Sequence, residues 1–168
     1  MGKTLHLMRH AKSSWSDPAQ GDRERGLNKR GQRDAPRMGQ ALSRLLEPQQ
    51  ICASPARRAQ ATLEGVMQGW PELDALQHRC EEELYTFSAG DLLDWLSDQS
   101  PEQDCLFLLG HNPALTELCN FLCGHAVIAN VPTAGYVGLH VSSDSWSSFA
   151  SGVAVLHQQL FPKELNHA

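Results

Sequence analysis

The fold is decided close to the N-terminus, by the stretch Leu5-His6-Leu7-Met8-Arg9-His10-Ala11-Lys12-Ser13-Ser14. Its first half is a short apolar run suited to a β-strand, and it stops abruptly at Arg9 and His10 before a polar, Ser-rich segment. A buried strand that ends in this way places the cation and the imidazole at the C-terminal edge of a sheet. Open α/β sheets usually bind their ligands at that edge, so groups elsewhere in the chain that reach it become informative.

Two later segments repeat this pattern of a strand followed by an abrupt turn. Residues 51–53 are a short apolar strand, and Ser54-Pro55 is expected to open a helix as its N-cap and first residue, which puts two arginines in the first helical turn. Residues 105–109 are continuously apolar, as expected of a central parallel strand covered on both faces, and they lead into Gly110-His111-Asn112. If the three strands are parallel neighbours, their polar ends converge on one edge of the sheet.

The two arginines of the second helix differ in the direction they face. Arg58 lies one turn before Thr62 and extends the inward stripe, whereas Arg57 falls on the polar face and is expected at the surface. A cation in the first turn of a helix interacts unfavourably with the helix dipole, by about 0.3–1 kcal/mol. Two arginines at this position therefore favour an anion bound at the helix N-terminus. Arginines, histidines and helix N-termini together indicate a pocket for a tetrahedral oxyanion.

Side chains have to supply the chemistry of such a pocket. The sequence contains no Gly-rich phosphate loop, no Gly-x-Ser-x-Gly motif and no His-Glu-x-x-His motif. With neither a nucleotide cradle nor a metal site indicated, a histidine is the candidate nucleophile. The arginines are then the groups that neutralise charge on a transferred phosphoryl group.

The remaining segments fit one α/β domain over residues 1–168. A helix face begins near residue 38, and either Asn28 or Asp34 can cap this helix, the first option leaving Pro36 in its interior. The other expected elements are a weak strand at 76–78, a helix capped by Ser88, a helix opened by Asn112-Pro113 and ended by Gly124, and two antiparallel strands near 136–141 and 153–157.

Composition narrows the range of partners. The chain has 14 basic and 19 acidic residues and a formal net charge of −5, which argues against general binding to nucleic acid or to anionic membranes. Any anion site must therefore be a local concentration of positive charge. No apolar run approaches membrane-spanning length and no signal peptide precedes the first strand, so the expected location is cytoplasmic.

The cysteines do not indicate a disulfide framework. There are five, an odd number, and all lie in apolar or mixed segments, which is typical of reduced thiols. Cys119 and Cys123 are four residues apart on an expected helix, with His125 just beyond, but a further metal ligand is not identifiable. We interpret this group as core packing.

Three motifs resemble the signature of the histidine phosphatase (phosphoglycerate-mutase-like) superfamily. They are Met8-Arg9-His10 after a strand, Ser54-Pro55-x-x-Arg58-Ala59-x-x-Thr62, and Gly110-His111-Asn112. The segments Arg9-His10-Ala11-Lys12-Ser13, Glu24 to Gly31, and Glu83-Leu84-Tyr85 resemble its small SixA-type phosphohistidine phosphatase branch. The resemblance runs in order from about Leu5 to Pro113 and departs from the commoner Arg-His-Gly of the superfamily at His-Ala-Lys without losing the nucleophile.

The resemblance implies a fold and a set of roles. The fold is a three-layer sandwich, with a mostly parallel central sheet and helices on both faces. His10 attacks phosphorus, Arg9, Arg58 and His111 hold the phosphate oxygens, and water then hydrolyses phospho-His10, with no metal or cofactor. Arg25 occupies a position where a basic residue often borders the pocket. Glu83 is the best match to the proton donor, although Glu81 and Glu82 are adjacent competitors and the role may be dispensable for a leaving imidazole.

The interval between Arg58 and His111 bears on the substrate. A helix, a weak strand, a turn and a second helix fill it, which leaves little room for a lid, and an open pocket suits a phosphate displayed on another protein, such as phosphohistidine on a histidine phosphotransfer domain. The basic segment Arg23–Arg33 is a candidate for docking an acidic partner. Two alternatives remain: a phosphatase or mutase for a small phosphorylated metabolite, and a non-catalytic phosphate-binding module.

Overall fold

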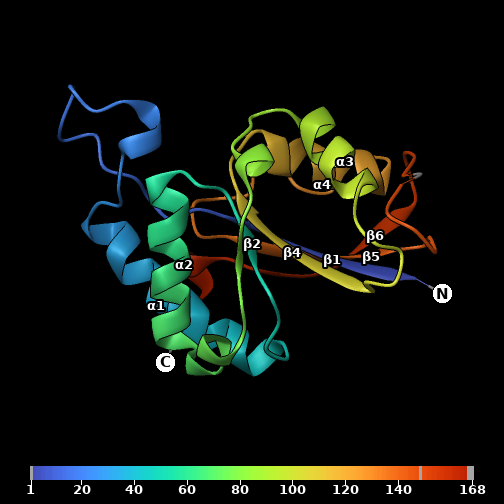
Figure 1. Ribbon diagram of the computed structural model, residues 1–168, viewed down its shortest axis with the longest axis horizontal. Helices are drawn as coiled ribbons and strands as arrows, with labels where there is room; N and C mark the ends of the chain where they lie inside the picture. Colours follow the sequence, from blue (N-terminus) through green and yellow to red (C-terminus); the bar gives the residue numbers. More distant parts are fainter. Residues whose placement is uncertain (1, 148, 166–168) are drawn as a thin grey trace.

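A computed structural model describes residues 2–147 and 149–165 of the chain (Figure 1). Over those residues, six strands form one sheet in the order β3-β2-β4-β1-β5-β6. Strands β1 to β4 run parallel to one another, whereas β5 pairs antiparallel with β1 and β6 pairs antiparallel with β5. The strand bounds are β1 Lys3–Arg9, β2 Cys52–Ala53, β3 Arg79–Cys80, β4 Cys105–Gly110, β5 Tyr136–Val141 and β6 Ala154–Leu160. The expected α/β fold with a late antiparallel pair is confirmed.

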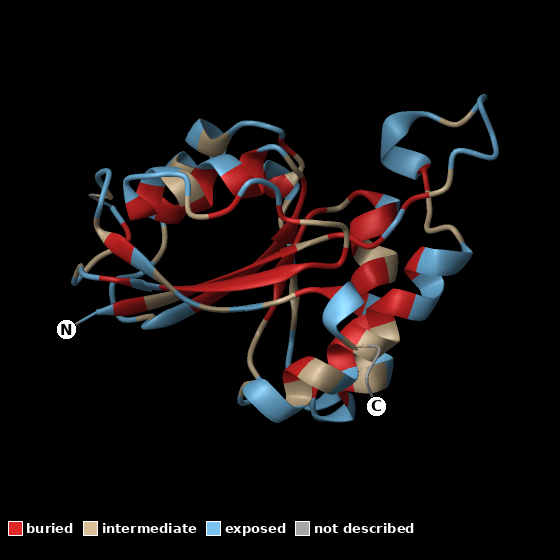
Figure 2. Ribbon diagram, turned by 180° about the vertical axis from the view of Figure 1, so that it is seen from behind, coloured by how far each residue is buried: buried red, intermediate tan, exposed pale blue. Residues whose placement is uncertain are grey.

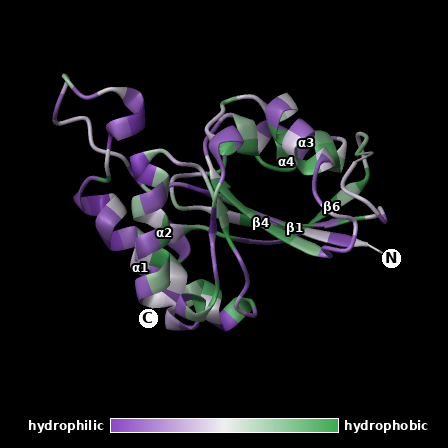
Figure 3. Ribbon diagram, in the orientation of Figure 1, coloured by the Kyte–Doolittle hydropathy of each residue, from purple (hydrophilic) through white to green (hydrophobic). Residues whose placement is uncertain are grey.

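Helices pack on both sides of this sheet. Helices α3 (Ala89–Ser97) and α4 (Ala114–Cys123) lie over one face, and α1 (Lys29–Leu45) and α2 (Arg57–Gly69) lie on the other side (Figure 1). The buried residues follow the sheet and the helix surfaces turned toward it (Figure 2), and the most hydrophobic stretches are the central strands (Figure 3). Short 3-10 turns complete the described chain: η1 Asp22–Glu24, η2 Pro71–Ala75, η3 Glu82–Leu84 and η4 Pro162–Leu165.

The central strands divide the apolar core into two clusters. In the register of β1 with β4, Leu7 pairs with Leu108 and Met8 pairs with Leu109. The two leucines at 7 and 108 belong to the cluster under α3 and α4, whereas Met8 and Leu109 belong to the cluster with α1 and α2. The continuous apolarity of residues 105–109 therefore reflects burial on both faces of the strand, as predicted.

Helix starts differ in part from the sequence expectation. Asn28 caps α1 by accepting a hydrogen bond from the Gly31 N–H (2.9 Å), so Pro36 lies inside the helix. Helix α2 begins at Arg57, two residues later than expected, because the Ser54 hydroxyl accepts from the Ala56 N–H (3.2 Å) within a turn that precedes the helix. The two arginines still occupy the first helical turn.

The starts of helix α4 and strand β3 also differ from the sequence expectation. Helix α4 begins at Ala114, and the Asn112 side chain accepts from the Thr116 N–H (3.1 Å) across its first turn. The expected strand at 76–78 is wrong in position, since β3 lies at 79–80. The cause is His78, whose Nδ1 accepts the Ile51 N–H (3.0 Å) and so replaces a main-chain partner at that point.

Glycines allow α1 and α2 to pack closely against each other. A Cβ atom added at Gly39 would lie 2.1 Å from the Val66 carbonyl oxygen, and one at Gly69 would lie 2.0 Å from that of Pro36. Such separations are far below van der Waals contact, so the two backbones can approach only without side chains.

Among the described helices, none is long and apolar enough to cross a membrane.

Candidate active site

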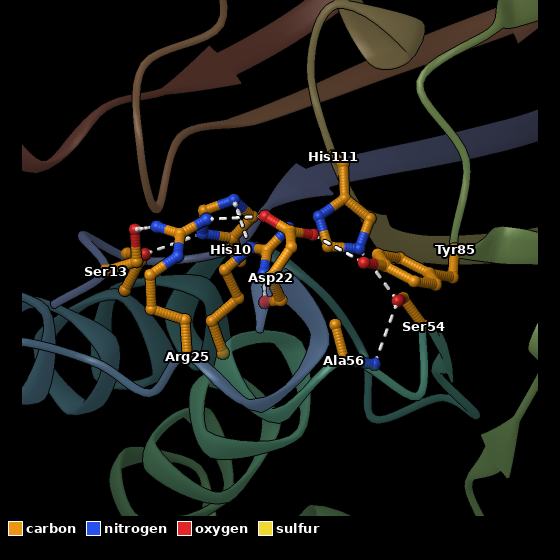
Figure 4. A network of polar contacts seen from close by, with 10 residues as sticks. His10, Ser13, Asp22, Arg25, Ser54, Ala56, Tyr85 and His111 are labelled. Atoms are coloured by element: carbon orange, nitrogen blue, oxygen red, sulfur yellow. Dashed lines mark hydrogen bonds and ion pairs between the residues drawn. The ribbon is translucent and has the colours of Figure 1, made fainter. Parts of the chain in front are cut away.

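Three strand ends meet at one edge of the sheet. His10 follows β1 and donates its main-chain N–H to the Gly110 carbonyl at the end of β4 (3.0 Å), and the Ser54 N–H after β2 bonds to Leu109 O (3.0 Å). The His10 and His111 rings are neighbours, with centroids 5.2 Å apart. Arg58 reaches the same place from the first turn of α2, with its Nε 3.3 Å from His10 Nε2. The side chains of His10, His111 and Asp22 lie close together there (Figure 4). The predicted convergence of these groups at the C-terminal edge is confirmed.

The imidazole of His10 is held in one tautomer. Its Nδ1 lies 2.7 Å from the Ala11 carbonyl oxygen, which can only accept, so Nδ1 carries the proton and Nε2 has a free lone pair. The Arg58 Nε–H donates to that lone pair at 3.3 Å. Burial first, and then the neighbouring His111, Arg58 and Arg9, lower the pKa of His10 to about 3 against the opposing hydrogen bond to Ala11. Nε2 is therefore unprotonated and buried at neutral pH, which is the state that a nucleophile requires.

Asp22 organises the cationic side of the site. Its carboxylate accepts from Arg58 Nη2 (3.0 Å), Arg25 Nη2 (2.9 Å) and the Tyr85 hydroxyl (2.5 Å), and its main-chain carbonyl accepts from Arg58 Nη1 (2.6 Å). Desolvation opposes ionisation, but hydrogen bonds from Tyr85, Arg25 and Arg58 outweigh it and hold the pKa of Asp22 well below its usual range. The terminal nitrogens of Arg58 are thus fixed by Asp22, and its Nε edge faces His10.

Sequence reasoning placed Arg25 at the site but left Asp22, Tyr85 and Ser13 out. Arg25 donates to Ser13 Oγ (2.6 Å), and its guanidinium lies over the Trp15 ring at 3.7 Å from the centroid. The spacing of Asp22, three residues before Arg25 in the most basic part of the chain, could have indicated that the two side chains pair. Tyr85 belonged to a quoted motif, but nothing in its spacing showed that its hydroxyl meets a residue of another loop.

Two buried nitrogens face the site without a protein partner. Arg9 donates through Nη1 to the Val131 carbonyl (3.1 Å), while its Nε is buried and unbonded; His111 contacts Ser54 Oγ through Nε2 (2.8 Å), while its Nδ1 is buried and unbonded. Over the described chain, these are two of three buried side-chain polar atoms that lack a hydrogen bond. Burying such groups without a partner costs free energy, which fits groups that bind a ligand. Burial and then Arg58 lower the pKa of His111 to about 4.

Glu83 does not join this network. It lies in η3 with an exposed side chain and lines an open hollow of about 330 Å³ together with three aspartates of the α3 region, Asp91, Asp94 and Asp98. The residue of this turn that reaches the site is Tyr85, whose ring lies edge-on to His111 with centroids 5.5 Å apart. The position of the proton donor was the weakest match in the sequence, and the structure gives Glu83 no described contact with His10, Arg58 or His111.

The segment 14–27 forms a strap beside the site. It projects from the body of the molecule between β1 and α1 (Figure 1) and carries η1. Besides the contacts of Asp22, the strap is tied to the η3 turn by Arg23, which donates to both oxygens of Glu82 (2.6 and 3.0 Å). The segment that borders the site therefore follows β1 and lies outside the interval between Arg58 and His111.

The described residues contain no group of three or more histidine, cysteine or acidic side chains arranged to hold a metal ion. Cys119 and Cys123 are buried in the apolar cluster under α3 and α4, and His125 Nδ1 bonds to the Cys123 carbonyl (3.1 Å). The five cysteines are free thiols. These contacts agree with the interpretation of core packing.

Comparison with known proteins gives a family and a fold. A family model described as the histidine phosphatase superfamily (branch 1) matches residues 5–106. An uncharacterized protein of Arabidopsis thaliana, described as chloroplastic, is 31% identical over 156 residues, which cover 87% of this chain and 70% of that protein.

Solved structures share the whole architecture. A candidate phosphohistidine phosphatase SixA from Nakamurella multipartitia superposes with a TM-score of 0.78 at 22% identity, covering 96% of this chain and 97% of that one. The protein histidine phosphatase SixA in complex with tungstate gives 0.75 at 21% identity, covering 97% and 99%. A mycobacterial glucosyl-3-phosphoglycerate phosphatase gives 0.68 at 15% identity, covering 93% and 97%. At these identities the likeness concerns the fold.

Proposed function

The chain belongs to the histidine phosphatase superfamily, and on that basis we propose that it hydrolyses phosphohistidine on a partner protein through a phosphoryl-His10 intermediate. Family membership supports phosphatase activity in general. The observation that carries the finer proposal is the electrostatic state of the site. Its nucleophile is unprotonated, and Asp22, the carboxylate bonded to its arginines, is held ionised and so has no proton to give to a leaving group.

The first step transfers the phosphoryl group to the enzyme. Nε2 of His10 attacks phosphorus, and an N–P bond to His10 forms. The P–N bond of the substrate breaks, and its electron pair goes to the substrate ring, which carries a proton on its other nitrogen and therefore leaves as neutral imidazole. The Nε–H of Arg58 lies beside His10 Nε2 at 3.3 Å and is placed to donate to a phosphoryl oxygen. Arg9 Nε and His111 Nδ1 supply further donors that have no protein partner.

Ser54 decides which nitrogen of His111 carries its proton. The Ser54 hydroxyl accepts the Ala56 N–H, and we infer that it donates its own proton to His111 Nε2 at 2.8 Å. Nδ1 of His111 then carries the imidazole proton and faces the site as a donor. In the second step, water attacks phosphorus of phospho-His10, a P–O bond forms, the N–P bond breaks, and inorganic phosphate leaves as Nε2 recovers its lone pair.

The leaving group discriminates between substrate classes. An alkoxide leaving from a phosphate ester needs a proton in the transition state, whereas a phosphohistidine ring that carries a proton on its other nitrogen leaves as neutral imidazole, a far weaker base that needs no further proton. A site whose bonded carboxylate is ionised fits the second case. Glu83 stays the candidate proton donor for the runner-up, a phosphatase or mutase for small phosphorylated metabolites, since such a substrate would require one.

Substrate comparison tests this proposal. We expect kcat/KM to be highest for a phosphohistidine protein and low for phosphosugars and phosphoglycerates. Glu83→Gln should leave phosphohistidine turnover unchanged and should lower any residual ester hydrolysis. Brief exposure to substrate should trap phosphate on the protein in an acid-labile, alkali-stable form, and His10→Ala should abolish both the trapping and the turnover. Full turnover by His10→Ala would overturn the assignment of the nucleophile.

The remaining elements of the proposal have simple tests. We propose that residues 1–168 act as one catalytic domain without a metal or cofactor, so a chelator should leave turnover unchanged. Phosphate binding without release from any substrate would instead favour a non-catalytic binding module. A cytoplasmic location is part of the proposal too; imaging of a tagged chain tests it, and the Arabidopsis relative, described as chloroplastic, makes an organelle the specific alternative.

A further inference from the structure

Four cations line one groove outside the site described above. Arg30, Arg33 and Arg37 stand on one side of α1, and Lys163 of η4 faces them across a hollow of about 480 Å³, whose wall Pro162 and Asp34 complete. Helix α1 and η4 pack against each other, so this is a junction of two elements and not a single helix surface. We call the hollow lined by these residues the basic groove.

The charge of the groove is strongly unbalanced. Asp34 is 2% exposed, and its carboxylate lies 3.5 Å from Arg30 Nε, 3.6 Å from Arg33 Nε and 3.6 Å from Arg37 Nη1. Asp34 is the one acidic residue among the described residues that line the hollow, and with Arg37 beside it the carboxylate cannot also offset Arg30, Arg33 and Lys163. The Arg30 and Arg33 side chains are 58% and 64% exposed, so the excess positive charge faces solvent in a chain whose formal net charge is −5.

The groove adjoins the active site. A smaller hollow of about 170 Å³ shares Arg30, Pro162 and Lys163 with it and continues to Asn130, Pro132 and Thr133. Val131, in the middle of that loop, accepts hydrogen bonds through its carbonyl from Arg9 (3.1 Å) and from Asn112 (3.0 Å). A bound chain could therefore follow the surface from the wall of the phosphate site into the basic groove.

The spread of the cations indicates the kind of ligand. Arg30 and Arg33 stand on α1 and Lys163 faces them from η4, so exposed cations line two walls of the hollow. A single phosphate is too small to follow such a surface, whereas carboxylates spaced along a protein segment can. We propose that the basic groove binds an acidic segment of the phosphorylated protein whose phosphohistidine enters the active site. This inference deepens the proposed function and rests on it for the identity of the substrate.

We expect the basic groove to speed association with the protein substrate and to orient that substrate on the surface. Charges at the rim of an interface raise association rates and fix register, and they weaken as salt screens them. The effect should therefore appear in KM and in kcat/KM for a protein or peptide substrate, and should be absent for a substrate too small to reach the groove.

Two phosphohistidine peptides of equal length provide the test, one with glutamates flanking the phosphohistidine and the other with glutamines in their place. The wild-type protein should prefer the glutamate peptide by about tenfold in kcat/KM at low salt, and the preference should shrink at high salt. Arg30→Gln combined with Arg33→Gln should remove the preference, and this pair leaves Arg37 to neutralise Asp34. Lys163→Gln, on the other element, should reduce it independently.

Arg44→Gln is the matched control, because Arg44 is an exposed arginine on the same helix outside the groove. It should keep the full preference, and all variants should hydrolyse phosphoimidazole at the wild-type rate. The inference is overturned if the preference survives in the groove variants or disappears equally in the control.

Binding without turnover separates this inference from the proposed function. Fluorescence anisotropy of the unphosphorylated glutamate peptide should show salt-sensitive binding that the groove variants lose and Arg44→Gln keeps. If that binding is present and no phosphohistidine substrate is hydrolysed, the proposed function fails while the groove stands. If the peptides are hydrolysed but neither preference nor binding depends on the groove residues, the groove inference fails while the function stands.

Discussion

Acidification from about pH 8 to about pH 5 should destabilise this protein through its buried histidines, and His10 gives the clearest case. Its imidazole is 7% exposed, and burial lowers its pKa to about 3, against an ordinary value of about 6.5. Between these two values the unfolded chain binds a proton that the folded chain does not. Stability is therefore fully present above the unfolded pKa and is lost as the pH falls toward the folded one.

The size of the effect follows from linkage. At about pH 5 the unfolded histidine is almost fully protonated while the folded one is almost fully neutral. This difference amounts to about 2 kcal/mol of unfolding free energy relative to about pH 8. That is a large fraction of the total stability of an ordinary domain. His6, which lies outside the site with a pKa lowered by burial to about 4, should contribute a similar loss of about 2 kcal/mol.

Urea unfolding followed by tryptophan fluorescence at the two pH values measures this directly. His10→Asn cannot take up the proton, so its stability should fall by about 2 kcal/mol less than that of the wild type over the same interval. His6→Asn should show the same reduction although it leaves the site untouched. Equal losses in the wild type and in both variants would refute the assignment of buried neutral imidazoles.

Three further substitutions test other parts of the structure. Asp22→Asn should lower kcat by about ten- to a hundredfold because Arg58 loses an ionic anchor, yet inorganic phosphate should inhibit more strongly, since a negative charge leaves the pocket; weaker phosphate binding together with lower kcat would instead mean that the strap has collapsed. Ser54→Ala removes the hydrogen bond to His111 and should cost about 1 kcal/mol of transition-state stabilisation, or roughly fivefold in kcat/KM. Ser54→Thr keeps the hydroxyl and should retain activity. Gly39→Ala puts a methyl group against the Val66 carbonyl oxygen and should lower the free energy of unfolding by about 2–3 kcal/mol, measured by denaturant titration; an unchanged midpoint would contradict the close approach of the two helices.

Local patterns were enough to predict the strands that build the site. The abrupt ends of the apolar runs at 5–8, 51–53 and 105–109 correctly gave parallel neighbours whose polar ends meet. Periodicity also separated the two arginines of α2, since Arg58 is buried and Arg57 is exposed. These features depend on residues close together in the chain, which is why they are readable from sequence.

Contacts between loops were not readable in this way. The bond of Tyr85 to Asp22 joins residues 63 positions apart, and neither stands in a periodic element that would reveal its direction. Helix α2 starts two residues later than expected because the Ser54 hydroxyl bonds to His111 and to the Ala56 N–H. This tertiary contact overrides the preference of serine for the helix N-cap. The basic segment that sequence reasoning placed at 23–33 is divided in the structure: Arg23 pairs with Glu82, Arg25 enters the site, and Arg30 and Arg33 face a separate groove.

The position of β1 in the sheet has a consequence for synthesis of the chain. β1 precedes the other strands of this sheet in the chain, yet Leu7 pairs with Leu108 on one side and with Val137 on the other. His10 is therefore synthesised before the strands that flank β1. The sheet around it can form only after β4 and β5 have been translated. Catalytic activity should report completed assembly and not partial folding. A chain divided between α3 and β4 would separate His10 and Arg58 from His111, so neither fragment should be active alone, and recovery of activity on mixing would measure how well the two halves reassociate.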